Sequence, residues 1–320
     1  MLHYVSYDQS CHVPNIIVDG AANEASELVL SHWPGNETPE PLKDDLSAQI
    51  ALNYLSSPDF HVTAEAVSNN HFDADGLVGI YSLLNGAEAL AQKGLLVDIA
   101  QAGDFDRYND RDAARVSFVL DAWTDPIRSP LKESIFAQDY PSVANILYEE
   151  LLPRLPNIIE KIDHLEKYWL SADQLLEATE EALTNGSIKI EAIPDIDLAI
   201  VYIPESNLSP LQNVHKMAIH NRTDHLRILL MQENKFELYY RYETWIELRS
   251  RPTLPRIELQ PLALTLTKQE SMDGKWSAGS INDLTPHLKL SGSYKSIIVD
   301  QSFKEQVIEY LRDAPIAAKE

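Results

Sequence analysis

The chain has 320 residues, a formal net charge of −23 and a single cysteine, Cys11. Its length favours two domains over one core, and its acidity argues against non-specific nucleic-acid binding, which needs a basic surface. Because no apolar run approaches the ~20 residues that span a bilayer, the N-terminus has no signal-peptide pattern and no intrachain disulfide can form, we expect a cytoplasmic protein with no membrane contact.

The first half of the sequence alternates strand-like and helix-like segments. Strands are expected at residues 16–20, 27–32, 62–68 and 95–100, with a helix as the alternative for 27–32. Helices are expected at residues 43–55, 77–92 and 110–123, where apolar residues recur with helical spacing. Strands that alternate with helices predict an α/β fold with a mostly parallel sheet and helices on both faces.

The second half has a different pattern. A long helical stretch from about 142 to 184 is expected to bridge two domains. A strand at 198–203 and a hairpin at 225–231 and 236–248 follow, and period-two alternation in the second hairpin strand predicts an antiparallel sheet packed on one side. Helices are expected at 260–271 and 302–311. We therefore expect an α/β metal-site domain at 1–170 and a smaller α+β substrate or lid domain at 185–320.

The most specific segment is Asn69-Asn70-His71-Phe72-Asp73-Ala74-Asp75-Gly76, between a predicted strand and a predicted helix. An imidazole and two carboxylates at alternate positions suit Mn²⁺, Mg²⁺ or Fe²⁺, and α/β proteins place their sites at such strand ends. Gly76 permits the bend that brings the donors together, and the free N–H groups of the next helix suit an anion. We expect His71, Asp73 and Asp75 to bind metal and Asn70 and Gly76 to contact substrate.

Two other interpretations of this segment stay open. Its spacing matches the first half of a calcium loop, although His71 stands at the first position and Ser82 at the twelfth, where a bidentate Glu is expected. Alternatively, the two carboxylates only cap a turn and the following helix while His71 bonds to the backbone, because Asp is common at turns.

Two further candidates end the first two predicted strands. If these strands are parallel to the strand before His71, Asp19 and His32 lie on the same edge of the sheet. Asp19 is then a metal ligand, or else only part of a turn with Gly20. His32 is either a metal ligand or a general acid in catalysis.

The C-terminal half is locally basic around Arg241, Arg249, Arg251 and Arg256. Arginines bind phosphate through paired hydrogen bonds, so Arg241, Arg249 and Arg251 are candidates for substrate binding. The alternative is a solvated sheet face on which glutamates pair with these arginines across strands.

The stretch His71-Phe72-Asp73-Ala74-Asp75-Gly76, followed by an apolar helix, resembles the first motif of the DHH phosphoesterases. That superfamily includes RecJ-type nucleases, manganese-dependent pyrophosphatases, exopolyphosphatases and small-oligonucleotide phosphodiesterases. The resemblance covers roughly residues 60–106 and implies that the His and both Asp bind a pair of divalent metals, usually Mn²⁺. The whole chain also resembles an uncharacterised bacterial family that carries Ser31-His32-Trp33-Pro34-Gly35.

The resemblance is incomplete. The second motif of the superfamily is an Asp at the end of the next strand, for which Asp98 and Asp104 are candidates, and Asp104 is favoured as a metal-binding and catalytic residue. The third motif, Asp-His-His, is absent, and its nearest counterpart is Asp163-His164 in a predicted helix. The glycine-rich element of the second domain is also absent.

The expected function is metal-dependent hydrolysis of a phosphoester or phosphoanhydride. The cofactor would be Mn²⁺ or Mg²⁺ and the substrate a small phosphorylated molecule; the sequence is compatible with a homodimer. The missing third motif supports an alternative from another class, a non-catalytic ligand- or partner-binding protein on a degenerate DHH-like fold. A scaffold without a small-molecule site is a third interpretation.

Overall fold

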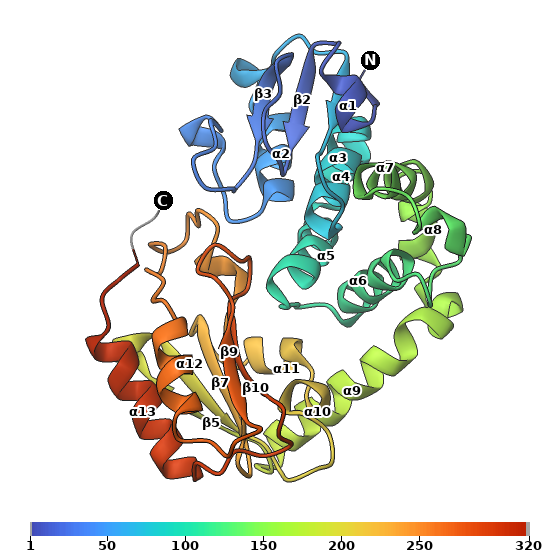
Figure 1. Ribbon diagram of the computed structural model, residues 1–320. Coiled ribbons are helices and arrows are strands. Elements are labelled where there is room, and N and C mark those ends of the chain that lie inside the picture. The colour runs from blue at the N-terminus through green and yellow to red at the C-terminus, as the bar shows by residue number, and fades with distance from the viewer. Residues whose placement is uncertain (1, 318–320) are drawn as a thin grey trace. The chain divides into compact units, whose positions relative to one another are not determined.

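The computed structural model describes residues 2–317. The chain divides into two compact units, Met1–Asp173 with Ile246–Pro252, and Gln174–Trp245 with Thr253–Glu320. The first division falls inside helix α9 (Glu166–Thr184) (Figure 1). The segment Ile246–Pro252, which we call the strap, belongs to the first unit although the chain on both sides of it belongs to the second. Among the described residues, no helix combines the length and apolarity needed to cross a membrane.

The first unit contains a four-stranded sheet in the order β1-β4-β2-β3, in which every pair of neighbours is parallel. Its strands are β1 (His3–Tyr4), β2 (Asn15–Val18), β3 (Ser26–Leu30) and β4 (Ala66–Ser68). All four residues of β2 are buried, which is typical of a parallel strand covered on both sides. Because the strands are parallel, their carboxyl ends meet at one edge.

The first unit also contains helices. They are α1 (Tyr7–Ser10), α2 (Ser47–Leu55), α3 (Ala74–Leu84), α4 (Gly86–Ala91), α5 (Lys93–Phe105), α6 (Arg111–Thr124), α7 (Tyr140–Leu151) and α8 (Leu155–Glu160), with short 3₁₀ turns at Glu40–Leu42, Pro58–Phe60, Glu133–Ile135 and Ile162–Leu165. Helix α3 is the central one and packs against α2, α5 and the sheet. Gly79 permits this approach, because a Cβ there would lie 2.5 Å from Val18 Cγ1.

The strand expected at 95–100 is wrong, because these residues lie in α5. Leu96, Ile99 and Ala100 are buried and have the i, i+3, i+4 spacing of one helical face. Near the end of α5, a Cβ on Gly103 would lie 2.4 Å from the Cβ of Ala74. The packing of α5 on α3 therefore determines that this short apolar segment is a helix, whereas the sequence alone is compatible with a helix or a strand.

Other boundaries differ from expectation by smaller amounts. The expected strand 62–68 is reduced to β4, and the expected helix 77–92 begins at Ala74 and breaks at Asn85 into α3 and α4. The helical stretch 142–184 divides into α7, α8 and α9, with Pro156 in the first turn of α8, a position that proline tolerates.

The second unit contains a six-stranded sheet in the order β5-β6-β7-β8-β10-β9. Its strands are β5 (Lys189–Ile193), β6 (Leu198–Tyr202), β7 (Arg227–Gln232), β8 (Lys235–Tyr240), β9 (Lys275–Ala278) and β10 (His287–Ser291). All neighbours are antiparallel except β6 and β7. The expected hairpin of β7 and β8 is confirmed, but its second strand ends at Tyr240, because a 3₁₀ turn at Tyr242–Thr244 follows.

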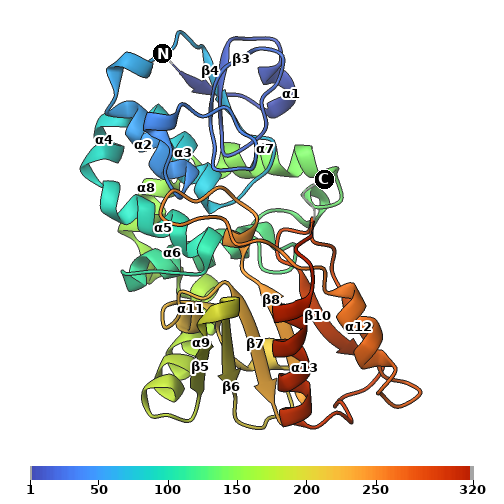
Figure 2. The same ribbon diagram turned by 90° about the vertical axis from the view of Figure 1, so that its left-hand side faces the viewer.

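Helices cover both faces of this second sheet. Helices α12 (Gln260–Thr267) and α13 (Asp300–Asp313) contribute Leu262, Phe303 and Val307 to one apolar core (Figure 2). On the other face, α10 (Pro210–Asn213) and α11 (Lys216–His220) pack with the end of α9 over a second core. A 3₁₀ turn at Pro194–Ile196 joins β5 to β6. The expected α/β domain with a parallel sheet, followed by a unit with an antiparallel-rich sheet, is thus confirmed.

Candidate metal centre

Six potential metal ligands gather at the carboxyl edge of the first sheet. They follow three neighbouring strands, except for one that lies in the last turn of α5. The six are Asp19, His32, His71, Asp73, Asp75 and Asp104. Two sets of three have ligand atoms within 4.8 Å of one another, and Asp19 belongs to both sets. The expectation that Asp19 and His32 share an edge with His71 is therefore confirmed.

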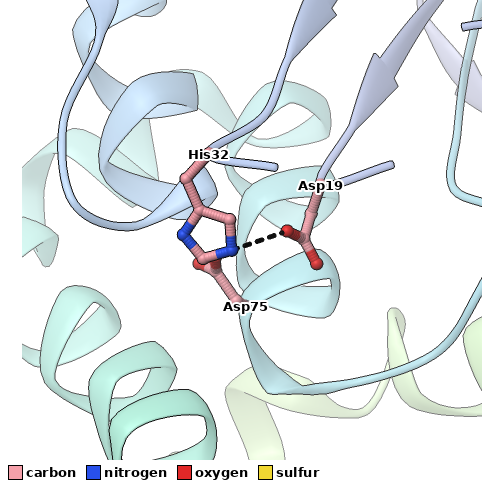
Figure 3. Close-up of side chains that lie close together, drawn as sticks. All are labelled: Asp19, His32 and Asp75. Carbon is pink, nitrogen blue, oxygen red and sulfur yellow. Dashed lines mark ion pairs between the residues drawn. The ribbon is translucent and has the colours of Figure 1, made fainter. Parts of the chain in front are cut away.

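The inner group consists of Asp19, His32, Asp75 and Asp104. His32 Nε2 lies 3.3 Å from Asp19 Oδ1 and 3.8 Å from Asp75 Oδ2 (Figure 3). It also lies 3.7 Å from Asp104 Oδ2. The side chains of Asp19, His32 and Asp75 have no exposed surface, and that of Asp104 is 5% exposed. The inner group is therefore closed to solvent by the protein itself.

The outer group consists of Asp19, His71 and Asp73. His71 Nε2 lies 3.3 Å from Asp19 Oδ2 and 2.6 Å from Asp73 Oδ2. The side chains of His71 and Asp73 are 20% and 30% exposed, and the Trp33 ring lies 5.0 Å from the His71 ring, centroid to centroid. The outer group thus opens to solvent, and Asp19 presents one carboxylate oxygen to each group.

The backbone at Asp19 is unusual. Its φ of +54° lies in the left-handed region, which few residues other than glycine adopt and in which Asp is enriched. The next residue is Gly20, and only glycine fits at this position because a Cβ there would lie 2.3 Å from Asn70 Oδ1. Residues held in such conformations concentrate at functional sites.

The carboxylates of Asp73 and Asp75 also cap the N-termini of helices. Asp73 Oδ1 accepts a hydrogen bond from Gly76 N and caps α3. Asp75 accepts hydrogen bonds from the first two N–H groups of α2, Ser47 N to Oδ2 and Ala48 N to Oδ1. The capping interpretation is therefore correct for Asp73 alone, because Asp75 caps α2 and not the following helix, and the His71 ring contacts Asp19 and Asp73 and not the backbone. Asp73 Oδ2 still faces His71, and Asp75 Oδ2 still faces His32.

Asp19, His32 and His71 stabilise one another's charged forms, whereas the charged form of Asp75 is disfavoured. Burial opposes the charge on Asp19, but its contacts with His32 and His71 outweigh burial and lower its pKa. Burial lowers the pKa of both imidazoles, but Asp19 raises that of His32 to about 9, and Asp73 with Asp19 raises that of His71 well above its usual value. Burial and the charge of Asp19 raise the pKa of Asp75 to about 7.

The donor set fits a divalent metal. It has only oxygen and imidazole nitrogen atoms, which suit Mn²⁺ and Mg²⁺. It lacks the thiolates that are common in structural zinc sites. Ligands at about 2.1 Å from one ion and at right angles lie about 3 Å apart, close to the 3.3–3.8 Å separations around His32 and Asp19. Within the described chain, the buried atoms Asp19 Oδ2 and His71 Nδ1 have no hydrogen-bond partner, so Asp19 keeps coordinating capacity.

His32 is fixed from three directions. Its ring atom Nδ1 lies 2.7 Å from the carbonyl oxygen of Asp45. Its backbone N–H donates to Ser47 Oγ, and its backbone carbonyl oxygen accepts a hydrogen bond from Glu247 N of the strap. A ligating His commonly has its second ring nitrogen bonded to a carbonyl in this way. Because His32 is fully buried, the position suits a metal ligand, and the alternative of a general acid that touches substrate is not supported.

Asp104 joins the site by a route that the sequence did not predict. It was expected at a strand end, but it stands in α5, where the close packing of Gly103 on Ala74 brings this turn to the start of α3. Asp98, the other candidate, accepts hydrogen bonds from Asn109 N and Asp110 N and thereby supports the turn before α6.

Two residues expected to contact substrate have other partners. Gly76 is buried, its N–H donates to Asp73, and a Cβ would lie 2.6 Å from the hydroxyl of Tyr148; the expected substrate contact of Gly76 is therefore wrong. Asn70 is half-buried and its Oδ1 accepts a hydrogen bond from Ala21 N. A substrate contact of Asn70 stays a prediction.

The expected arginine bracket does not form as one group. Arg241 is 1% exposed and forms a buried ion pair with Glu243 in the second unit, so its expected substrate contact is wrong. Arg249 and Arg251 lie in the strap of the first unit, where Arg249 is exposed and pairs with Glu40. Contact of these two with substrate stays a prediction.

Sequence reasoning missed two residues around the site. Ser47 is fully buried, and its Oγ donates to Asp19 Oδ1 at 2.7 Å. The hydroxyl of Tyr148 accepts a hydrogen bond from Asn69 Nδ2 beside the His71 segment. A serine in the first turn of an amphipathic helix is ordinary, so only the contact with Asp19 reveals that Ser47 belongs to the site. Asp163-His164, the nearest counterpart of an Asp-His-His motif, is exposed in a 3₁₀ turn.

Comparisons place the whole chain in one family. The model of a family of unknown function, DUF6687, matches residues 1–320, so the chain belongs to that family. No match was found among curated proteins or among solved structures. Family membership therefore leaves the activity to be argued from the site itself.

Proposed function

We propose that this member of a family of unknown function is a divalent-metal-dependent hydrolase of phosphoesters or phosphoanhydrides. The observation that carries the proposal is the placement of Asp19, with one carboxylate oxygen in the inner group and the other in the outer group. A carboxylate shared in this way fits a pair of Mn²⁺ or Mg²⁺ ions. Two such ions, held about 3.5–4 Å apart, activate water for attack and neutralise charge on the phosphoryl group.

The missing Asp-His-His motif does not leave the ligand set incomplete under this proposal. Asp19 and His32, which precede the His71 segment in the chain, supply a shared carboxylate and a second imidazole. With Asp75 and Asp104 they would hold the inner ion, while His71 and Asp73 would hold the outer ion together with Asp19. The resemblance to the DHH phosphoesterases would then extend from one motif to a two-ion site.

The difference in exposure between the two groups assigns them different tasks. A catalytic metal needs a coordination position open to water or substrate, and only the outer group has exposed ligands. The buried inner group would retain its ion and help to orient the shared Asp19. Substrate would therefore meet the site on the side of His71 and Asp73, beside the Trp33 ring.

The charge of the protein supports a requirement for metal. A net charge of −23 repels a phosphorylated substrate, and bound divalent cations reverse the potential locally. The N-terminal end of α3, which begins at Ala74 directly after the outer group, adds a partial positive charge on the same side. These two features favour an anionic substrate over a neutral one.

Purified protein freed of metal with a chelator tests the proposal. With Mn²⁺ or Mg²⁺ restored, we expect hydrolysis of at least one of four probes: p-nitrophenyl phosphate, its bis-ester, pyrophosphate and polyphosphate. Asp73→Asn should reduce the rate by at least 100-fold, because it removes an outer ligand, whereas Asp163→Asn, on the exposed 3₁₀ turn, should match the wild type.

Two results distinguish the alternatives. Tight binding of Mn²⁺ without hydrolysis of any probe would indicate the non-catalytic binding protein that the missing motif also allowed. The proposal is falsified if isothermal titration detects no Mn²⁺ or Mg²⁺ binding and no probe is hydrolysed.

A further inference from the structure

Ser47, the first residue of α2, touches three of the four residues of the inner group. Its Oγ donates to Asp19 Oδ1 at 2.7 Å and accepts from His32 N at 3.2 Å, and its backbone N–H donates to Asp75 Oδ2 at 2.7 Å. The residue has no exposed surface. The bonds to Asp19 and Asp75 are short, and all three are made inside the protein.

The bond to Asp19 determines how the shared carboxylate is turned. Asp19 Oδ1 receives the Ser47 hydroxyl on the side of His32, and Oδ2 is thereby left on the side of His71 at 3.3 Å. The two imidazoles also face this carboxylate, His32 Nε2 at 3.3 Å from Oδ1 and His71 Nε2 at 3.3 Å from Oδ2. Of the contacts that oppose rotation of the carboxylate about its last bond, the Ser47 hydroxyl is the closest, at 2.7 Å.

We infer that Ser47 is a positioning residue that turns the Asp19 carboxylate so that each of its oxygens serves one metal ion. This inference rests on the proposed two-ion site. Its consequence is that the two ions do not bind independently, because an ion in the inner group holds Asp19 in the orientation that the outer ion needs. Removal of the hydroxyl should weaken the outer ion even though Ser47 makes no contact with His71 or Asp73 that the structure records.

The hydroxyl can be removed with little change in volume. Ser47→Ala keeps the backbone N–H that bonds to Asp75 and loses only Oγ. Ser47→Thr keeps a hydroxyl at the same position. Ser82→Ala is a matched control, because Ser82 is also fully buried in a neighbouring helix of the first unit, and its Oγ bonds only to Val78 O among the recorded contacts.

The experiment titrates chelator-treated wild type and the three variants with Mn²⁺ by calorimetry. We expect two ions per chain in the wild type. Loss of a residue that orients a metal ligand typically costs 10–100-fold in affinity, so Ser47→Ala should lose about that factor for the outer ion. Ser47→Thr and Ser82→Ala should bind within about threefold of the wild type.

Two further readouts separate positioning from folding. Electron paramagnetic resonance of the fully loaded wild type should show two exchange-coupled Mn²⁺ ions, and the coupling should weaken in Ser47→Ala. The metal-free melting temperature of Ser47→Ala should fall no further than that of Ser82→Ala. If Ser47→Ala does not fold, Ser47→Cys, which keeps the volume and only a weak donor, takes its place.

The outcomes are distinguishable. A wild type that binds no Mn²⁺ refutes the proposed function and, with it, this inference. A wild type that binds two ions beside a folded Ser47→Ala that binds both with wild-type affinity overturns the inference alone. Equal loss of affinity in folded Ser47→Thr and Ser47→Ala also overturns it, because the hydroxyl would then not be the cause.

Discussion

His32 Nε2 lies 3.3 Å from Asp19 Oδ1, although thirteen positions separate these residues in the chain. The contact follows from the pairing of β2 with β3, in which Val18 lies opposite Leu30 and Asp19 N donates to Leu30 O. Both residues therefore leave the sheet at its carboxyl edge. The pairing of the two strands therefore sets the distance between Asp19 and His32, while Asp75 and Asp104 join them from α3 and α5.

Metal should stabilise the folded protein. An ion that binds only the native state at 100 times its dissociation constant raises the free energy of unfolding by about 2.7 kcal/mol per site. We expect Mn²⁺ to raise the melting temperature of chelator-treated protein. Asp19→Asn should abolish this rise, because Asp19 belongs to both groups. Scanning fluorimetry checks this, with Asp163→Asn as a control that should keep the full rise.

The outer ion should be separable from the inner ion. Asp73→Asn keeps an oxygen that can accept the hydrogen bond from Gly76 N, so the cap of α3 survives, while the carboxylate that faces His71 is lost. We expect this variant to bind one Mn²⁺ per chain where the wild type binds two. Metal analysis after gel filtration measures the ratio, and an unchanged ratio of two would contradict the assignment of Asp73.

Acid should destabilise the second unit through His287. Burial and then the charges of Lys216 and Lys289 lower the pKa of His287 to about 4, and its ring stacks on that of Tyr239. The unfolded chain binds this proton near pH 6.5 and the folded one only near pH 4, so stability is lost as pH falls through that window.

Substitution of His287 should make the melting temperature depend less on pH in the acid range. His287→Gln removes the titrating group, so its melting temperature should fall less between pH 7 and pH 5 than that of the wild type. His164→Gln, at an exposed position of the first unit, should follow the wild type. Parallel curves for His287→Gln and the wild type would contradict the assignment.

The buried pair of Arg241 and Glu243 should matter for stability and not for metal binding. Both side chains are almost fully buried, and removal of one partner from a buried ion pair costs about 3–5 kcal/mol because a charge is left unpaired. Glu243→Gln should lower the free energy of unfolding by about that amount in urea denaturation. The double variant Arg241→Met, Glu243→Leu should recover part of the loss, and Mn²⁺ affinity should be unchanged in both.

The sequence predicted those parts of the site that follow segments with a clear strand or helix pattern. The strands before Asp19 and His32 are short apolar runs, and the His71 segment stands between a strand and a helix, so parallel pairing alone brings these donors to one edge. Asp104 was assigned to the site for a wrong reason, because its helix was mistaken for a strand. An apolar stretch of six residues does not distinguish the two structures.

Other features depend on contacts between distant parts of the chain. Ser47 begins an amphipathic helix, where a serine is ordinary, and nothing in the sequence places Asp19 and Asp75 beside it. Arg241 and Arg249 are eight residues apart in an apparently continuous strand, yet one is buried in the second unit and the other lies on the first. The break after Tyr240 separates them, and no turn signal marks it.

The strap gives the chain a property that its two-unit organisation would otherwise hide. Glu247 N bonds to the carbonyl of His32, and Arg249 N and Ser250 N both bond to the carboxylate of Asp45, whose own carbonyl meets the His32 ring. Seven residues encoded late in the chain thus brace a ligand encoded near its start. A polypeptide shortened to residues 1–173 would retain every proposed metal ligand but lose this brace, so a single cut does not yield the whole first unit.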